Sequence, residues 1–166
     1  MFHKLLHTDL DRTFTLLRFV LGTVFFVHGA QKMLGWYGGA GFDATMSMFS
    51  EGMNIPAPLA FLAIATEFFG SLALILGLLG RLAGVAILVE MMVAVFLVHL
   101  PFGFFMNWTG TQGGEGFEYH LLAIAIALTI AVKGAGAWSL DYALDRRLGR
   151  PTAAYPEGRW GKAHAH

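Results

Sequence analysis

Four apolar stretches, each about long enough to cross a lipid bilayer, account for most of this chain of 166 residues. A membrane-spanning helix needs about 20 mainly apolar residues. Hydrophobic residues make up 56% of the sequence and charged residues only 13%, which leaves no room for a separate soluble domain. The stretches are approximately Phe14–Leu34, Ala57–Leu79, Leu82–Leu100 and Tyr119–Trp138. We therefore predict an all-α fold, an integral membrane four-helix bundle embedded in the lipid bilayer.

The basic residues are distributed unevenly about these predicted spans. With four crossings, only Lys32 falls on one side of the membrane. The opposite side carries Lys4, Arg12, Arg18, Arg81, Lys133, Arg146, Arg147, Arg150, Arg159 and Lys162. Because Lys and Arg accumulate in cytoplasmic segments, this asymmetry predicts that both termini and the Gly80–Arg81 turn are cytoplasmic.

Two further segments have a recognisable pattern. In the first outer loop, over residues Phe42–Met53, helical spacing separates Phe42, Met46, Phe49 and Met53. This pattern predicts a short amphipathic helix that lies on the membrane surface or caps the bundle. A covered loop is the alternative. We expect a membrane domain over residues 1–145 and a polar, basic cytoplasmic tail over residues 146–166, which contact with anionic lipid explains adequately.

Ionisable residues lie well inside three of the spans: His28, Glu67 and Glu90. A charge at this depth is disfavoured by at least ~2.5–3.5 kcal/mol, so such residues indicate a functional site. Small residues recur every three or four positions around Glu67 and Glu90, and His120 shares a face with Ala123 in the last span, which turns these polar groups into the bundle. The sequence predicts a polar cleft that opens outward.

Lys32 and its neighbours extend this predicted site. His28, Gln31 and Lys32 share one helix face, and Lys32 is a suitable partner for Glu67 or Glu118. Three structural explanations compete with a functional one. The two span carboxyl groups can be protonated and hydrogen-bonded between helices, the small-residue faces can form a dimer interface in a homo-oligomer, and His99 fits an interfacial position. Arg18 and Lys133 are expected to extend to the headgroups.

Several ligands fit the predicted cleft. A quinone needs hydrogen-bond donors for its ring carbonyls and proton carriers for its reduction, and His and Glu supply both. A metal is the second alternative, held by His28, His99 or His120 with the carboxylates of Glu67, Glu90 and Glu118, because the chain has no cysteine. No Glu-x-x-His pair typical of di-iron bundles occurs, so we favour the organic ligand. A proton path through Glu67 and Glu90 is the third.

The order of short motifs along the chain resembles that of the DoxX-like membrane proteins. The motifs are Arg18-Phe-Val-Leu-Gly22, His28-Gly-Ala-Gln-Lys32, Glu67-Phe-Phe-Gly70, Gly77-Leu-Leu-Gly80-Arg81, Asn107-Trp-Thr-Gly110, Glu115-Gly-Phe-Glu118 and Gly134-Ala-Gly-Ala-Trp-Ser-Leu-Asp141. The resemblance covers about residues 14–141. It implies a small four-helix protein of the bacterial inner membrane, in a family associated with quinone-linked sulfur oxidation and redox-stress complexes.

The resemblance also extends to individual polar residues. The polar positions that recur in the family correspond here to Arg18, Lys32, Glu67, Asn107 and Glu118. Glu90 and His120 match no shared motif and depend on the spacing argument alone.

The resulting hypothesis is a quinone-linked oxidoreductase subunit that works with a soluble or membrane oxidoreductase partner and not with nucleic acid. Its catalytic residues are predicted to be Glu67, His28 and Glu90, and its ligand-binding residues Gln31, Lys32, Asn107, Glu118 and His120. A non-catalytic scaffold that recruits a soluble oxidoreductase is the alternative, and a path for protons or small solutes is the third.

Overall fold

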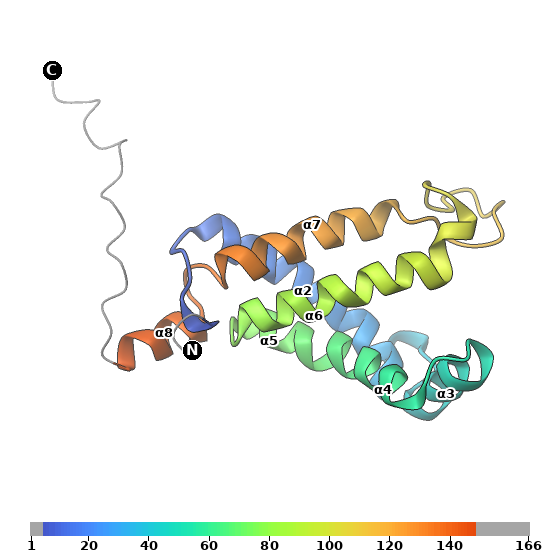
Figure 1. The fold of residues 1–166 in the computed structure, drawn as a ribbon, viewed down its shortest axis with the longest axis horizontal. Helices are drawn as coiled ribbons and strands as arrows, with labels where there is room; N and C mark the ends of the chain where they lie inside the picture. The colour runs from blue at the N-terminus through green and yellow to red at the C-terminus, as the bar shows by residue number, and fades with distance from the viewer. Residues whose placement is uncertain (1–4, 149–166) are drawn as a thin grey trace, which may run out of the picture.

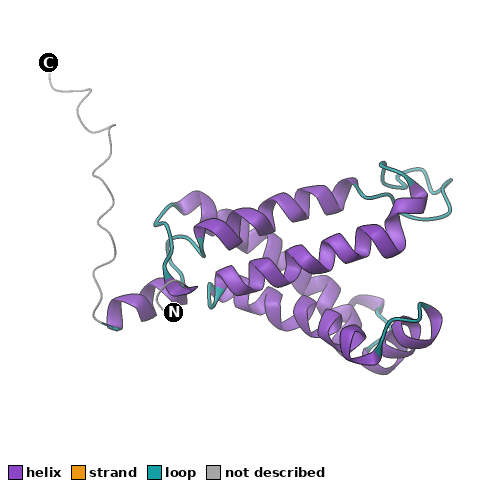
Figure 2. Ribbon diagram, in the orientation of Figure 1, coloured by secondary structure: helices purple, strands orange, loops and turns teal. Residues whose placement is uncertain are grey.

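The computed structural model describes residues 5–148, and this part of the chain consists of helices and loops without a strand (Figure 2). The predicted all-α class is therefore confirmed. The elements in order are α2 (Arg12–Leu34), η1 (Trp36–Gly38), α3 (Phe42–Ser47), η2 (Met48–Gly52), α4 (Ala57–Ala65), η3 (Thr66–Gly70), α5 (Ser71–Leu76), α6 (Gly80–Ala94), η4 (Val95–His99), η5 (Leu100–Phe102), α7 (Glu118–Lys133) and α8 (Leu140–Arg147).

Three continuous helical segments of the described chain are long and apolar enough to cross a membrane: Arg12–Leu34, Ala57–Leu76 and Gly80–Phe102. They confirm a multi-pass membrane protein. The fourth predicted span is shorter than expected, because α7 ends at Lys133 and not at Trp138. Gly134 and Gly136 then take positive φ values of 90° and 78° and turn the chain into the separate helix α8. Four crossings and cytoplasmic termini stay predictions.

The bundle has two distinct ends (Figure 1). The α5–α6 turn, α8 and the first described residues lie at one end, which we call the α8 end. Helices α3 and α4 and the loop between η5 and α7 lie at the other, the α3 end. The short helix predicted in the first outer loop is confirmed, since α3 and η2 together cover Phe42–Gly52. Most of the predicted tail, residues 149–166, lies outside the described residues.

Small residues bring the spans close together, as the sequence pattern predicts. Gly29 of α2 packs directly on η3: a methyl group added there would come within 2.6 Å of the backbone carbon of Glu67 and the backbone nitrogen of Phe68. On α6, a methyl group at Gly84 would lie 2.9 Å from the carbonyl oxygen of Ala127. The apolar core between these contacts consists of Leu21, Phe25, Leu74, Ala83, Ile87, Met91, Ala123, Ala127 and Ile130.

The prediction that the Arg18 side chain extends to the headgroups is wrong. The residue is only 3% exposed, and its side chain does not extend to the headgroups. The guanidinium donates to the carbonyl oxygens of Ala135 at 2.6 Å, of Leu74 and Ile75 at 2.7 Å, and of Trp138 at 2.8 Å. Arg18 thus ties α2 to the end of α5 and to the segment between α7 and α8.

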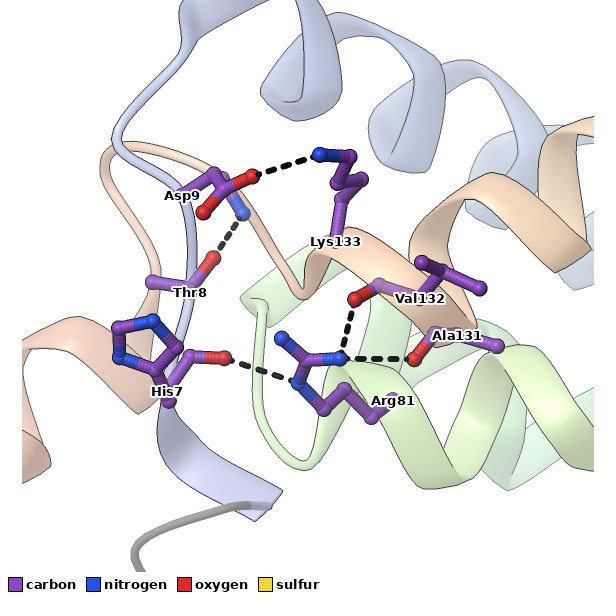
Figure 3. Close-up of polar contacts among 8 residues, drawn as sticks. His7, Thr8, Asp9, Arg81, Ala131, Val132 and Lys133 are labelled. Carbon is purple, nitrogen blue, oxygen red and sulfur yellow. Dashed lines mark hydrogen bonds and ion pairs between the residues drawn. The ribbon is translucent and has the colours of Figure 1, made fainter.

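Other polar contacts close the same end of the bundle. Arg81 donates to the carbonyl oxygens of His7 and Ala131 at 2.9 and 3.0 Å, and to that of Val132 (Figure 3). The Asp141 carboxylate accepts from the backbone N–H groups of Leu79 and Gly80 at 2.6 and 2.8 Å, so α8 caps the start of α6. Because the atoms involved are mostly backbone, these contacts fix helix positions closely.

Candidate functional site

A cavity of about 560 Å³ opens at the α3 end, which is within the usual range of small-molecule sites. Its wall comes from every span and from both loops at this end. The lining residues are Phe25, His28, Lys32, Met48, Phe49, Met53, Ile55, Ala63, Glu67, Glu90, Met91, Val93, Ala94, Leu97, Val98, His99, Met106, Glu115, Tyr119 and His120. The four Met side chains give the wall an adaptable apolar surface.

Five of the residues predicted from the sequence line this cavity together: His28, Lys32, Glu67, Glu90 and His120. They come from four different helical segments. Their roles remain predictions, but their convergence is a feature of the structure. It arises because the small-residue faces of the helices turn the polar groups inward.

Three other predicted residues do not line the cavity. The Gln31 amide donates to the carbonyl oxygen of Tyr37 at 3.4 Å. The Asn107 side chain exchanges two hydrogen bonds with the backbone of Gln112, at 3.1 and 3.0 Å, and so shapes its own loop. Glu118 is the first residue of α7. A ligand in the cavity would therefore meet none of them in this arrangement.

Lys32 and Glu67 form an ion pair within the cavity wall, which confirms the predicted partnership. The ammonium of Lys32, in the last turn of α2, donates to both oxygens of the Glu67 carboxylate. Glu67 itself is 7% exposed and sits in the π-helical turn η3. A pair this buried needs the close approach of α2 and η3 at Gly29.

Glu90 is the second carboxyl group of this cluster. It interacts electrostatically with both Glu67 and Lys32, and its Oε2 atom is buried without a hydrogen-bond partner in the described chain. One ammonium therefore faces two carboxyl groups.

A pair of histidines forms the other polar part of the cavity. The rings of His99 and His120 lie with their centroids 4.0 Å apart, and the Tyr119 ring meets His120 edge-on at 5.4 Å. His99 Nδ1 is 2.8 Å from the carbonyl oxygen of Glu115. By contrast, His120 Nδ1 is buried and has no partner in the described chain. That nitrogen therefore has an unmet hydrogen bond in the wall of the cavity.

Sequence reasoning missed much of this wall. It gave His99 an interfacial position or, as an alternative, a place among the metal ligands, and it proposed no site role for Tyr119 or Glu115. The π-helical turn η4 explains the case of His99, because a π turn changes which side chains face inward and regular helical spacing cannot reveal it. The Met and Phe residues of the first outer loop were the available signal for its apolar part.

All three π-helical turns found in residues 5–148 contribute to the cavity: η2 with Met48 and Phe49, η3 with Glu67, and η4 with Leu97, Val98 and His99. Turns of this kind are frequent at functional sites. Within the described residues, no group of three or more His, Asp and Glu side chains is placed to hold a metal ion. The arrangement presents one ammonium with two carboxyl groups, an imidazole nitrogen without a partner in the described chain, and a wide apolar wall.

Comparison with known proteins gives two kinds of match. The family model described as DoxX matches residues 13–100. A protein of Bacillus subtilis (strain 168) named "Putative oxidoreductase CatD" is 31% identical over 126 residues, which cover 76% of this chain and 82% of that protein. An uncharacterized protein of Haemophilus influenzae is 32% identical over 125 residues, or 75% of this chain and 85% of that protein. No solved structure gives a significant match.

Proposed function

Because the chain belongs to the DoxX family, as a multi-pass membrane protein with a relative named as an oxidoreductase, we propose that it is a redox-associated membrane subunit whose cavity binds a quinone or similar small molecule. The setting of this proposal is a bacterial cytoplasmic membrane crossed four times, with both termini cytoplasmic and the cavity facing outward. Electrons are exchanged with a partner oxidoreductase.

One observation carries the proposal: two buried polar atoms without partners, Glu90 Oε2 and His120 Nδ1, belong to residues that line the same cavity. Their helices run antiparallel (Figure 1), and Gly84 packs on Ala127. This register places Glu90 and His120 within about one helical turn, ~5 Å, along the bundle axis. A single ring with two polar atoms can therefore bind both groups when these two side chains turn their buried atoms toward the cavity.

A quinone has the chemistry that these groups complement. Its two carbonyl oxygens accept hydrogen bonds, and its reduction to a quinol consumes two electrons and two protons. The carboxyl cluster and the histidine pair are suited to deliver those protons, and Phe25, Phe49 and the Met side chains pack on the ring. The Lys32–Glu67 pair holds Glu90 in a defined electrostatic environment.

The proposal is tested by quinone binding to the purified protein in lipid nanodiscs. We expect Glu90→Leu and His120→Ala to weaken binding of a benzoquinone at least tenfold, since each removes one polar contact of roughly 1.5 kcal/mol or more. Glu67→Gln and His28→Ala should weaken it as well. Glu51→Gln makes the same chemical change as Glu67→Gln at an exposed residue of η2 that does not line the cavity, and it should bind like the wild type.

Correct insertion is checked for each variant by its yield and elution profile after extraction. If the wild type binds no quinone, or if all four cavity variants bind it as tightly as Glu51→Gln does, the proposal is wrong.

A further inference from the structure

The exposure of the lining residues shows where the cavity is open. Most lining side chains are buried or half-buried, but Met48, Val93 and Leu97 are 52%, 48% and 58% exposed. The His28 side chain, which also lines the cavity, is exposed too. Glu115, in the loop between η5 and α7, is an exposed lining residue as well and gives access from the α3 end. The other four residues place a second opening among α2, η2 and the second half of α6 with η4.

The depth of this opening can be worked out from the helix that carries Val93 and Leu97. The span Gly80–Phe102 ends at Phe102, nine residues beyond Val93 and five beyond Leu97. At 1.5 Å per residue, Val93 lies about 13 Å and Leu97 about 7 Å inside the end of the span. The hydrocarbon core of a bilayer is about 30 Å thick, so the opening at Val93 faces acyl chains and not water.

His28 gives an independent reason to expect a ligand here. It lies six residues before the end of α2, is exposed, and makes no hydrogen bond to the described part of the chain. An imidazole facing hydrocarbon without a partner is costly. A molecule that has a polar group at the opening and an apolar part in the lipid would remove this cost.

We infer that the ligand is a lipid-dissolved molecule with a polar ring and a long apolar chain, which reaches the site laterally from the bilayer. This inference rests on the proposed function. The ring occupies the cavity beside Glu90 and His120, and the chain passes Val93 and Leu97 into the acyl region. Each added methylene favours transfer into lipid roughly fourfold, so a long-chain ligand is concentrated where the opening lies.

The test compares two radiolabelled probes with the protein in nanodiscs: a benzoquinone with a ten-carbon chain, and the same ring with a methyl group in its place. Val93→Phe puts a bulky side chain in the opening. We expect it to slow association of the long-chain probe at least tenfold. The methyl probe should change less than threefold, because it can also arrive from the aqueous side beside Glu115, the exposed lining residue of the η5–α7 loop.

Val89→Phe is the matched control. Val89 lies one turn earlier on α6, is also 48% exposed, and does not line the cavity. It should leave both probes unaffected. Leu97→Phe provides a second blocking variant should Val93→Phe extract poorly, and the same selective effect is expected.

The outcomes separate this inference from the proposed function. Selective loss of the long-chain probe in the blocking variants supports lateral access. If both probes bind the wild type and the blocking variants behave like Val89→Phe, or slow both probes equally, lateral access is refuted while the binding site stands. If neither probe binds the wild type, both the proposed function and this inference are refuted.

Discussion

Replacing Arg18 with Met should destabilise the protein far more than the same replacement of an exposed arginine. Met fills the space of the aliphatic part of Arg18 but has none of the guanidinium N–H donors. Arg18 is only 3% exposed. Four carbonyl oxygens lose a hydrogen bond. Leu74 keeps another donor, the backbone N–H of Gly77 at 3.0 Å, so we count the loss for Ile75, Ala135 and Trp138.

The magnitude follows from the burial of those carbonyls. Leaving a buried acceptor unpaired costs about 1–3 kcal/mol. The bonds to Ile75 and Trp138 are only partly buried, so the lower value applies to them. We expect the free energy of unfolding to fall by about 3–5 kcal/mol, which is large for a single substitution. For a protein of this size that corresponds to a decrease of roughly 10 °C in Tm.

The assay is thermal unfolding in mild detergent, followed by circular dichroism. Arg147→Met makes the same chemical change at an exposed position of α8 and should alter Tm by less than about 2 °C. Arg18→Lys separates charge from geometry, because an ammonium cannot reach carbonyls in four directions. If Arg18→Lys were as stable as the wild type, or Arg18→Met as stable as Arg147→Met, the role assigned to these four bonds would be wrong.

Three further predictions concern close packing, pH and topology. Gly29→Ala should lower the free energy of unfolding by about 1–3 kcal/mol and weaken quinone binding, because the added methyl group separates α2 from Glu67. Gly52→Ala is the control, since an added methyl group there meets nothing within 4 Å; equal melting temperatures of the two variants would contradict this prediction. Asp11 is the N-cap of α2, and the hydrogen bond from Thr13 lowers the pKa of its carboxyl group below 3.8. Asp11→Ala should therefore lower Tm at neutral pH, and the difference in Tm from the wild type should shrink as the pH falls through that lowered pKa. A difference that grows on acidification would refute the role of Asp11 as a charged cap. The chain has no cysteine, so an impermeant maleimide added to intact cells should label Glu51→Cys and not Arg147→Cys, and the reverse pattern would overturn the predicted orientation.

Three of the four predicted spans and the convergence of the polar groups agree with the structure, because both follow from regular helical geometry. A carboxyl group such as that of Glu67 within an apolar run avoids lipid by facing the interior of the bundle. The small residues at helical spacing around it show which helix face packs against the other helices. The sequence could not predict the histidine pair. His99 enters the cavity through a π turn, and the choice between a regular and a π turn depends on tertiary packing that spacing does not encode.

The error at Arg18 has a different physical origin. An arginine near the end of a span has two ways to avoid hydrocarbon: it can extend to the headgroups, or it can bond to backbone carbonyls that no helix satisfies. The second requires a free carbonyl cluster, and that cluster exists here only because α5 ends at Leu76 and the chain turns between α7 and α8. These breaks come from residues far from Arg18 in the sequence, so its local context gave no sign of them.

The bonds at the α8 end also explain how the α3 end can hold a cavity of this size. Arg18, Arg81 and Asp141 join the helices through backbone atoms, and the apolar core from Leu21 to Ile130 packs the adjacent part of the bundle. At the other end the wall is formed by Met and Phe side chains, three π turns and one ion pair. A bundle fixed at one end needs fewer contacts at the other, so single polar atoms such as Glu90 Oε2 and His120 Nδ1 can stay without a partner and the fold is kept. On this argument, loosening the α8 end by Arg18→Met should weaken quinone binding even though the residue lies outside the cavity, and unchanged affinity in a destabilised variant would show that the two ends are independent.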